Sequence, residues 1–473
     1  MRVIIIGCTQ GGTTVADTIL KVTQDVEITI IERNSKISYQ PYGITIACQN
    51  QQCVPLEKMF NNSISNFKKQ CVTVYLEHEA IDIDFNNKFV IIQNLTNETK
   101  KQVEYDQLVI ATGAMPKIPK YCQGLSHIEN VFMLKSYSQG KSLQQYITRN
   151  RHKGKKVAIL GAGQIGVQMI ETFVKNNFYV KLIEGEDRIM KNHYDKKISD
   201  IVTSFLQEQE CEVHFGKKVA NIQQKEESNE IVITMEDGTE IYSDAVLLSI
   251  GFTANTSFLL KAAKKNNVAL ENIDGAIVVD QNSQSSINNV YAVGDCACAK
   301  FNPTNTQQYI PQATNAIRQG VSAAASILHN YATNQKVSFD LIPSTGSQYS
   351  SAAKVFDMAM ASTGLNTHQA KEHFHDVRTS QLTILEKPLF SESNQEVTIR
   401  VIYREESKIL LGCQIFGQKN NIELIQIASV FITNKMTLPQ IAQQDFAFNP
   451  WFGKPVHVMQ QVILQALLGV QQE

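Results

Sequence analysis

The sequence is too long for a single hydrophobic core. Its 473 residues exceed the ~250–300 at which single cores stop growing, so two or three domains are expected. Hydrophobic residues make up 43% and charged residues 19%, and 44 basic against 45 acidic residues leave a formal net charge of −1. Without a cationic excess to neutralise phosphates, we expect neither a nucleic-acid partner nor an anionic membrane partner. No apolar run reaches the ~18–20 residues of a membrane helix, so no membrane insertion is expected.

The cysteines are odd in number and scattered, which is more typical of reduced thiols than of a secreted disulfide framework. They are Cys8, Cys48, Cys53, Cys71, Cys122, Cys211, Cys296, Cys298 and Cys413. The opening MRVIIIGCT contains an apolar run of only four residues, which is too short for the core of a signal peptide. We therefore expect a cytoplasmic protein, and no metal site.

The first segment, RVIIIGCTQGGTTVADTIL, predicts a buried strand (Val3–Ile6), a glycine turn and a helix that begins near Gly12. Gly7, Gly11 and Gly12 allow a tight turn and close approach of the backbone to a pyrophosphate, whose charge the helix N-terminus favours. The next segment, VEITIIERN, predicts a strand ending at Glu32, where a carboxylate suits a ribose diol. A lone glycine motif is weak evidence, but the acid at this distance favours a nucleotide site.

Farther along, YDQLVIATGAMPKIP predicts a strand that runs into Ala111, Thr112 and Gly113, with prolines marking a boundary. The second glycine motif then follows strand Val157–Leu160. It has the full G-x-G-x-x-G spacing at Gly161, Gly163 and Gly166 and precedes a helix. Two motifs 154 residues apart are strong evidence for two bound dinucleotides.

Glu184 ends the strand that follows the second motif. A carboxylate there accepts hydrogen bonds from a free 2′-hydroxyl and repels a 2′-phosphate, which favours NADH over NADPH. Arg188 and His193 follow closely. Near the end of this region, NNVYAVGDCACAK predicts a strand ending at Gly294 and Asp295, followed by an irregular stretch and a helix. An aspartate at a strand end can anchor a chain of hydroxyl groups such as a ribityl chain.

Taken together, these residues resemble the flavoprotein pyridine nucleotide-disulfide oxidoreductases, in the branch of NADH oxidases, NADH peroxidases and coenzyme A-disulfide reductases. The resemblance covers essentially the whole chain. Its most specific matches are GCTQGGT (7–13), ATG (111–113), GAGQIG (161–166), IGFTANT (250–256), YAVGD (291–295), NPTNTQQYIPQATNAIRQG (302–320) and DFAFNPWFGKP (445–455).

The resemblance implies an α/β protein with two Rossmann-like domains and an α+β C-terminal domain through which two chains pair. The FAD domain (1–117 and 246–330) would be split by the NAD domain (118–245), and the dimerisation domain would span 337–473. In the last of these, EVTIRVIYREESKILLGCQIFG alternates as an antiparallel hairpin should, and helices are expected at Ile422–Asn434 and Val456–Leu468.

The resemblance also implies which residues hold each cofactor. FAD would be bound by Gly7, Gly11, Gly12, Glu32, Arg33, Ala80, Ala111, Thr112, Gly113, Asp295, Ala313 and Thr314. NADH would be bound by Gly161, Gly163, Gln164, Ile165, Gly166, Glu184, His193 and Gly251.

Two positions depart from the family, and both belong to its redox chemistry. The branch reads roughly S-F-x-S-C-G-I where this chain reads ISYQPYGI, so Tyr42 stands at the cysteine that faces the flavin. Gln10 stands where a histidine usually accompanies that cysteine. A phenol with an ordinary pKa near ~10 cannot cycle through sulfenic acid or disulfide states, and an amide does not titrate. The roles of Tyr42 and Gln10 as catalytic residues are therefore open.

Three functions remain. The leading hypothesis is an FAD-dependent NADH oxidoreductase that passes electrons directly to a small-molecule acceptor, either oxygen, giving hydrogen peroxide, or a quinone. The alternative is a catalytically slow protein that binds FAD and NADH as a sensor or scaffold. The third is a water-forming oxidase, peroxidase or coenzyme A-disulfide reductase that uses another thiol. Cys48 and Cys53 have C-x₄-C spacing, but they begin about 9 Å beyond Tyr42 if that segment is helical.

Overall fold

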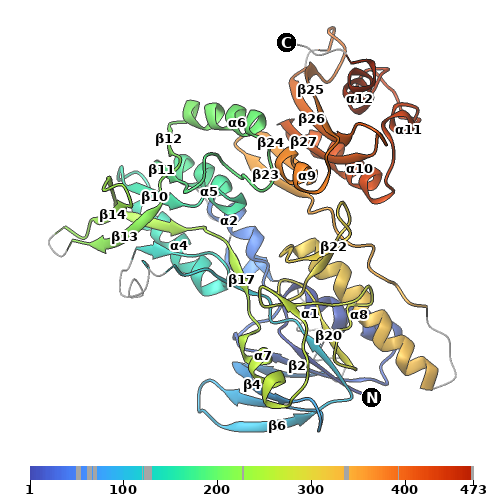
Figure 1. Cartoon of the computed structure of the whole chain (residues 1–473). Coiled ribbons are helices and arrows are strands. Elements are labelled where there is room, and N and C mark those ends of the chain that lie inside the picture. Colours follow the sequence, from blue (N-terminus) through green and yellow to red (C-terminus); the bar gives the residue numbers. More distant parts are fainter. Residues whose placement is uncertain are drawn as a thin grey trace.

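The computed structural model describes residues 1–49, 55–60, 67, 72–119, 121, 130–225, 228–334, 340–391 and 394–469. Three groups of elements are visible in Figure 1: the N-terminal domain at the bottom, a second domain at the left and the C-terminal domain at the top right. Two parallel sheets and an antiparallel C-terminal sheet confirm the predicted α/β architecture. None of the described helices is long and apolar enough to cross a membrane.

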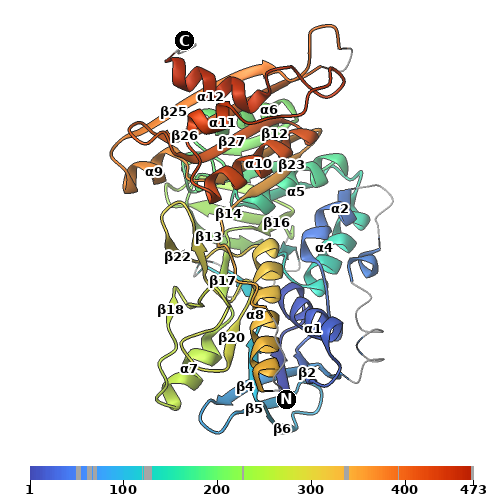
Figure 2. The ribbon, with the colours of Figure 1, turned by 90° about the vertical axis from the view of Figure 1, so that its right-hand side faces the viewer.

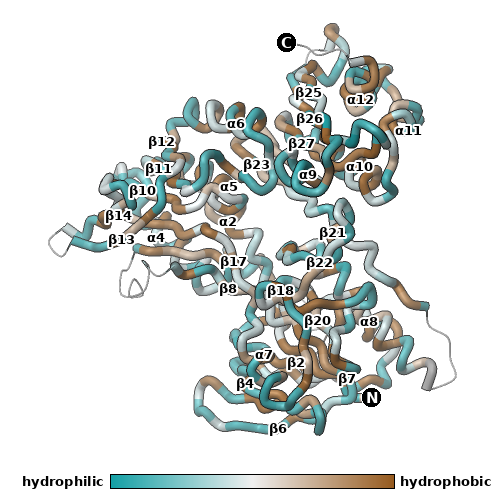
Figure 3. Tube along the Cα trace, in the orientation of Figure 1, coloured by the Kyte–Doolittle hydropathy of each residue, from teal (hydrophilic) through white to brown (hydrophobic). Residues whose placement is uncertain are grey.

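The sheet of the first domain is parallel, with strand order β20-β7-β1-β2-β3. Its strands are β1 (Arg2–Ile6), β2 (Glu27–Glu32), β3 (Thr73–Leu76), β7 (Gln107–Ile110) and β20 (Val290–Ala292). Helices α1 (Gln10–Val22) and α8 (Ala313–Asn334) lie side by side on one face (Figure 2). Val3 and Ile5 pack beneath these helices, whereas Ile4 packs on the opposite face. A strand that buries both faces is nearly all apolar, as RVIII is, and the central strands are largely hydrophobic in Figure 3.

The opposite face of this sheet is covered by a small antiparallel sheet and one helix. Their bounds are β4 (His78–Asp84), β5 (Phe89–Asn94), β6 (Lys100–Glu104) and α7 (Ser257–Lys265). Leu259 and Ala263 of α7 share a core with Val90 of β5 and Ile4 of β1. The parallel sheet is therefore buried between two layers, and the carboxyl ends of its strands form one edge.

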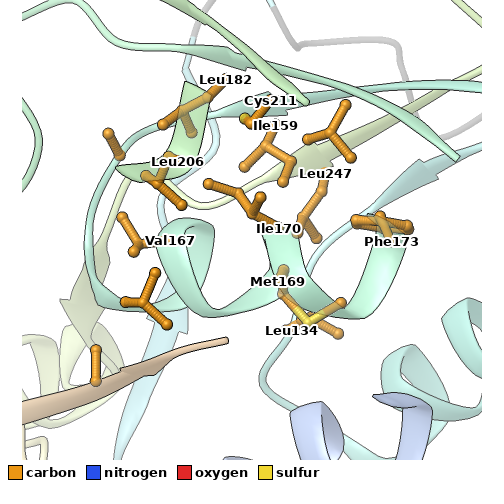
Figure 4. Packing of buried hydrophobic residues seen from close by; sticks show 14 of the residues in the cluster. Leu134, Ile159, Val167, Met169, Ile170, Phe173, Leu182, Leu206, Cys211 and Leu247 are labelled. Atoms are coloured by element: carbon orange, nitrogen blue, oxygen red, sulfur yellow. The ribbon is translucent and has the colours of Figure 1, made fainter. Parts of the chain in front are cut away.

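The second domain repeats the plan with the strand order β12-β11-β10-β16-β9. Its strands are β9 (Val131–Phe132), β10 (Lys156–Leu160), β11 (Tyr179–Ile183), β12 (Cys211–His214) and β16 (Ala245–Leu248). Helices α2 (Ile44–Gln49), α4 (Tyr137–Asn150), α5 (Gln164–Lys175) and α6 (Lys196–Glu208) contribute to the core on one face. Figure 4 shows Val167, Ile170 and Phe173 of α5 packed against Ile159 and Leu247 from the strands.

The other face of the second sheet is covered by an antiparallel sheet of β13 (Val219–Gln224), β14 (Ile231–Met235) and β15 (Glu240–Ser243). Because β16 pairs with β10, the second domain extends to Leu248, three residues past the expected boundary at 245. The two connections between the domains pair with each other, as β8 (Ala114–Pro116) and β17 (Phe252–Ala254).

The C-terminal domain is an antiparallel sheet with strand order β23-β24-β27-β26-β25, packed under helices. Its elements are β23 (Ser351–Val355), β24 (Met358–Gly364), α9 (Thr367–His373), β25 (Val377–Leu385), β26 (Glu396–Arg404), β27 (Leu410–Gln418), α10 (Ile422–Thr433), α11 (Leu438–Ala442) and α12 (Val458–Leu468). The predicted hairpin is present as β26 and β27, and the two predicted helices are α10 and α12. The expected boundary at 337 lies outside the described residues.

Several local predictions need correction. Helix α1 begins at Gln10 rather than near Gly12, because the chain enters the helix directly after Thr9. Strand β20 ends at Ala292, before Gly294, whose φ of +79° turns the chain out of the strand. The stretch expected to be irregular contains a hairpin of β21 (Ala299–Phe301) and β22 (Thr306–Gln308). A further two-stranded ladder joins β18 (Asn272–Ile273) to β19 (Ala276–Ile277).

Two buried charges fasten the second domain to the C-terminal domain. Glu171 on α5 is 2% exposed and accepts hydrogen bonds from Lys354 of β23 at 2.5 and 2.7 Å. Asp195, which precedes α6, accepts a bond from Arg400 of β26 at 2.7 Å and bonds from Thr367 at 2.6 and 2.9 Å. Breaking such a buried pair on one side leaves an uncompensated charge, so these contacts fix how the two domains meet.

Candidate active site

One cavity of about 1860 Å³ lies where the three domains meet. It is larger than the ~300–1,000 Å³ of an ordinary ligand pocket, which suits two dinucleotides better than one small molecule. Both glycine turns border it, as do Tyr349, Ser350 and Ser351 from the segment leading into the C-terminal domain.

The first glycine turn brings helix α1 unusually close to strand β1. Gly7 has a φ of +93°, and a Cβ on it would lie 2.3 Å from the carbonyl oxygen of Ala111. A Cβ on Gly12 would lie 2.0 Å from the carbonyl oxygen of Gly7. Glu32 is 3% exposed and accepts a hydrogen bond from the backbone N–H of Cys8 at 2.9 Å. The carboxylate of Glu32, at the end of β2, is therefore hydrogen-bonded to the backbone of the turn that follows β1.

The second glycine turn has the same construction. Gly161 has a φ of +100°, and a Cβ on Gly166 would lie 2.1 Å from the carbonyl oxygen of Gly161. The Glu184 carboxylate accepts hydrogen bonds from the backbone N–H groups of Ala162 at 2.6 Å and of Glu186 at 2.9 Å. Both turns thus hold an acid where a ribose diol meets the turn, which is the geometry of a dinucleotide-binding fold.

Cations beside Glu184 are already paired with acids. Lys191 lies 2.7 Å from Glu186, and Arg188 lies 3.0 Å from Asp187. His193 packs edge-on against Tyr349, with 4.7 Å between the ring centroids. Burial lowers the pKa of His193 to about 4, so its ring is neutral at pH 7. This surface therefore suits a ribose hydroxyl better than a 2′-phosphate.

The structure brings the predicted site residues together. Every one of them borders the cavity except Gly12 and Gly166, which lie beneath the turns where the helices pack on the strands. The predicted FAD-binding and catalytic residues that border the cavity are Gly7, Gln10, Gly11, Glu32, Arg33, Tyr42, Ala80, Ala111, Thr112, Gly113, Asp295, Ala313 and Thr314. The predicted NADH-binding residues that border it are Gly161, Gly163, Gln164, Ile165, Glu184, His193 and Gly251.

Lys135 and Tyr309 are among the cavity residues that were not predicted as site residues. The Lys135 ammonium lies 2.6 Å from the Asp295 carboxylate and 4.9 Å from the ring centroid of Phe252. The Tyr309 hydroxyl is buried without a hydrogen-bond partner among the described residues. A buried hydroxyl left unpaired costs about 1–3 kcal/mol, so a bound group or a water that accepts or donates here would stabilise the fold. Neither residue belongs to a glycine motif, and only the folded chain brings them to the cavity.

Tyr42 lies in the short 3₁₀ turn η1 (Pro41–Gly43), directly before α2. It is 56% exposed and borders the cavity, as does Gln10. Partial burial raises the pKa of the phenol above its ordinary value, while the neighbouring Gln10 side chain opposes this. A neutral phenol and an amide thus lie beside each other at the two positions where a redox cysteine and its histidine were expected.

The described cysteines are buried. Among the described cysteines, only Cys8 borders the cavity; it is fully buried in the first turn, 3.4 Å from the Thr13 hydroxyl. Burial raises its pKa to about 12, which keeps it a thiol. Cys48 is also fully buried and packs in the core with α4 and α5, while its carbonyl accepts a bond from Asn176. Cys53 lies outside the described residues.

Two parallel dinucleotide-binding folds that border one cavity are the architecture of a protein that holds two dinucleotides side by side. Comparison with known proteins agrees. Residues 1–320 match the family model of the pyridine nucleotide-disulphide oxidoreductases, and residues 350–459 match the model of their dimerisation domain. The chain therefore belongs to this family.

The chain is 30% identical to an NADH oxidase of Enterococcus faecalis over 96% of this chain and 97% of the other. Among solved structures it resembles a water-forming NADH oxidase from Lactobacillus brevis bound to NADH, with a TM-score of 0.89 and 26% identity over 99% and 98% of the two chains. It also resembles an NAD-dependent persulfide reductase from A. fulgidus, with a TM-score of 0.89 and 25% identity over 99% of this chain and 83% of the other. These likenesses identify an FAD-dependent oxidoreductase of the NADH oxidase type, with FAD and NADH as its cofactors.

Proposed function

We propose that this enzyme passes two electrons from NADH through FAD directly to a small-molecule acceptor, without a cysteine redox centre. The proposal is supported by the placement of Tyr42 beside Gln10 at the cavity, where the resemblance to the family would put a cysteine and a histidine. Bound FAD would supply two-electron redox chemistry between the nicotinamide and the acceptor.

The chain's own residues would bind and position the cofactors. The first turn, with Glu32 and Asp295, would hold FAD, and the second turn, with Glu184, would hold NADH. Tyr42 would lie beside the flavin as a neutral hydroxyl that can donate a hydrogen bond. A phenol cannot form a disulfide or a sulfenic acid, so it stores no electrons between NADH and the acceptor.

The water-forming oxidase and the persulfide reductase among the neighbours fit the third hypothesis, a reaction that uses another thiol. The described thiols argue against it. Cys8 is buried in the first turn, and Cys48 does not border the cavity. A thiol that performs redox chemistry needs an accessible thiolate, whereas burial favours the neutral form.

With oxygen as acceptor, the balanced reaction is NADH + H⁺ + O₂ → NAD⁺ + H₂O₂, and with a quinone the product is the hydroquinone. The dimerisation domain supports a homodimer, in which two chains would pair through the C-terminal domain. We propose a cytoplasmic location from the reduced thiols expected of the sequence.

Stopped-flow mixing of the FAD-loaded protein with NADH tests the enzymatic proposal. We expect rapid bleaching of the flavin absorbance, and under air one H₂O₂ for each NADH oxidised. A flavin that stays oxidised for many minutes would favour the sensor hypothesis, and NADH oxidation without peroxide would favour the thiol-based one. The double variant Tyr42→Cys with Gln10→His supplies a matched comparison, because it restores the family's residues and should lower the peroxide yield.

A further inference from the structure

Three aromatic rings form a cluster at one side of the cavity, and neither glycine turn uses it. Tyr39, Phe60 and Tyr137 contact one another with ring centroids 5.2 to 5.8 Å apart. They come from three separate segments: the loop before η1, the residue after the 3₁₀ turn η2 (Leu56–Met59), and the start of α4. All three border the cavity.

Positive charge lies over the faces of these rings. The Lys36 ammonium is 5.0 Å from the ring centroid of Phe60 and 5.0 Å from that of Tyr137, and Lys36 also borders the cavity. Lys141 lies 5.9 Å from the Tyr137 ring. The Tyr137 hydroxyl donates a 2.6 Å hydrogen bond to Glu57. Two lysines and one glutamate leave one net positive charge beside the cluster.

The cluster adjoins Tyr42. The segment around Tyr39 pairs with the segment around Phe60, where the N–H of Gln40 donates to the carbonyl of Met59 at 2.8 Å. The Met59 sulfur lies only 2.1 Å from where a Cβ on Gly43 would stand, so η2 packs directly on the turn that carries Tyr42. These contacts place the aromatic cluster next to the proposed flavin-facing residue.

The two cofactors are assigned to other parts of the cavity. The adenosine end of FAD is expected at Glu32 and Ala80, and Ala80 packs on the far side of the first sheet. NADH is expected at the N-terminus of α5. Tyr39 packs in the core with α4 and α5, and none of the three aromatic residues is assigned to either cofactor. The cluster therefore borders the cavity at residues to which no cofactor group has been assigned.

We propose that the cluster of Tyr39, Phe60 and Tyr137, with Lys36, binds the electron acceptor, and that this acceptor is a planar aromatic molecule carrying negative charge, of the quinone class. The inference rests on the proposed function and names its acceptor. Aromatic rings favour stacked or edge-to-face contact with a planar ring, and the lysine favours an anionic substituent. The overall reaction is NADH + H⁺ + quinone → NAD⁺ + hydroquinone, in which two electrons and two protons reach the quinone oxygens.

Binding of 1,4-naphthoquinone-2-sulfonate to the oxidised, FAD-loaded protein tests this without NADH. The dissociation constant is followed by the change in flavin absorbance, with neutral 1,4-naphthoquinone as the second probe. Phe60→Ala should weaken binding of both probes about tenfold, since it removes one stacking face. Lys36→Met should weaken binding of the sulfonate about three- to fivefold and leave the neutral probe unchanged.

Lys225→Met is the matched control, because Lys225 lies 4.6 Å from the ring centroid of Tyr242 in a similar lysine–tyrosine contact away from the cavity. Tyr137→Leu repeats the ring test should Phe60→Ala fail to fold. If the sulfonate does not bind at millimolar concentration, or binds all variants alike, the acceptor site is overturned. That outcome differs from failure of the proposed function, which shows in the response of the flavin to NADH.

Discussion

Replacing Glu184 with glutamine tests the nicotinamide site most sharply. Its carboxylate accepts two backbone N–H groups, from Ala162 at 2.6 Å and Glu186 at 2.9 Å, and has lone pairs left for a ribose diol. An amide keeps only one acceptor oxygen, so the ribose loses a charge-assisted hydrogen bond. Such a bond contributes about 1.5–3 kcal/mol, which weakens NADH binding roughly 12- to 140-fold.

The same change removes the repulsion of NADPH. A carboxylate ~5 Å from a phosphate of charge about −2 is repelled by about 1.7 kcal/mol in water, a factor of roughly 15, and by more in a less polar site. The NADH-to-NADPH preference of Glu184→Gln should therefore fall at least about 100-fold. The assay is the dissociation constant of each nucleotide, measured on FAD-loaded protein.

The exposed Glu212 on the neighbouring strand β12 pairs with Lys181 and does not border the cavity, so Glu212→Gln is the control. It should leave the preference within threefold of the parent. A general distortion of the turn would weaken both nucleotides equally and leave the ratio intact. An unchanged ratio in Glu184→Gln would refute the assignment of the second turn to NADH.

Three further predictions concern stability. Gly12→Ala and Gly166→Ala should each destabilise by about 1–3 kcal/mol, because the added Cβ meets a carbonyl oxygen at 2.0 or 2.1 Å; a thermal melt with an unshifted midpoint would contradict this. Asp195→Ala should lower the free energy of unfolding in urea by about 3–5 kcal/mol, because it leaves the buried Arg400 guanidinium without its carboxylate partner. The double variant Asp195→Ala with Arg400→Met should recover part of this loss. Because the folded-state pKa of His193 lies near 4, below the ordinary 6.5, the folded protein binds fewer protons between these values. Stability should fall as pH drops from 6.5 to 4, by at most about 3 kcal/mol from this residue, and His193→Gln should show a shallower decline in the same urea assay.

The glycine turns could be predicted because their signal is local. A buried strand, a glycine with positive φ, a helix N-terminus and an acid after the next strand all lie within about 30 residues, and the sequence alone shows that spacing. The structure also explains why position 12 is a glycine. Gly12 lets helix α1 pack against the carbonyl of Gly7, as Gly166 lets α5 pack against the carbonyl of Gly161, and both lie five residues after the first glycine of their turn. At the glycine positions of the spacing, the first motif differs in having Thr9 where the second has Gly163.

Residues that reach the cavity from distant segments could not be predicted in this way. Lys135 follows a two-residue strand and meets Asp295 only because the two domains fold against each other. Phe60 and Tyr137 lie 77 residues apart in sequence, and no periodicity marks either as part of a site. The hairpin of β21 and β22 was also missed, since its strands have three residues each and no apolar alternation.

Tyr42 was predicted in part from the sequence and in part only from the fold. The resemblance to the family singles it out, but its physical setting came from the fold: a half-exposed phenol beside Gln10 at the edge of the cavity. The fold thus brings together the two residues that were expected to replace the family's cysteine and histidine.

An anaerobic titration of the FAD-loaded protein with NADH, followed by absorbance, tests the central claim most directly. Without a thiol beside the flavin, the protein should take up two electrons per subunit and show no long-wavelength charge-transfer band. Uptake of four electrons per subunit, or the appearance of such a band, would mean that a sulfur atom lies against the flavin and would contradict direct transfer.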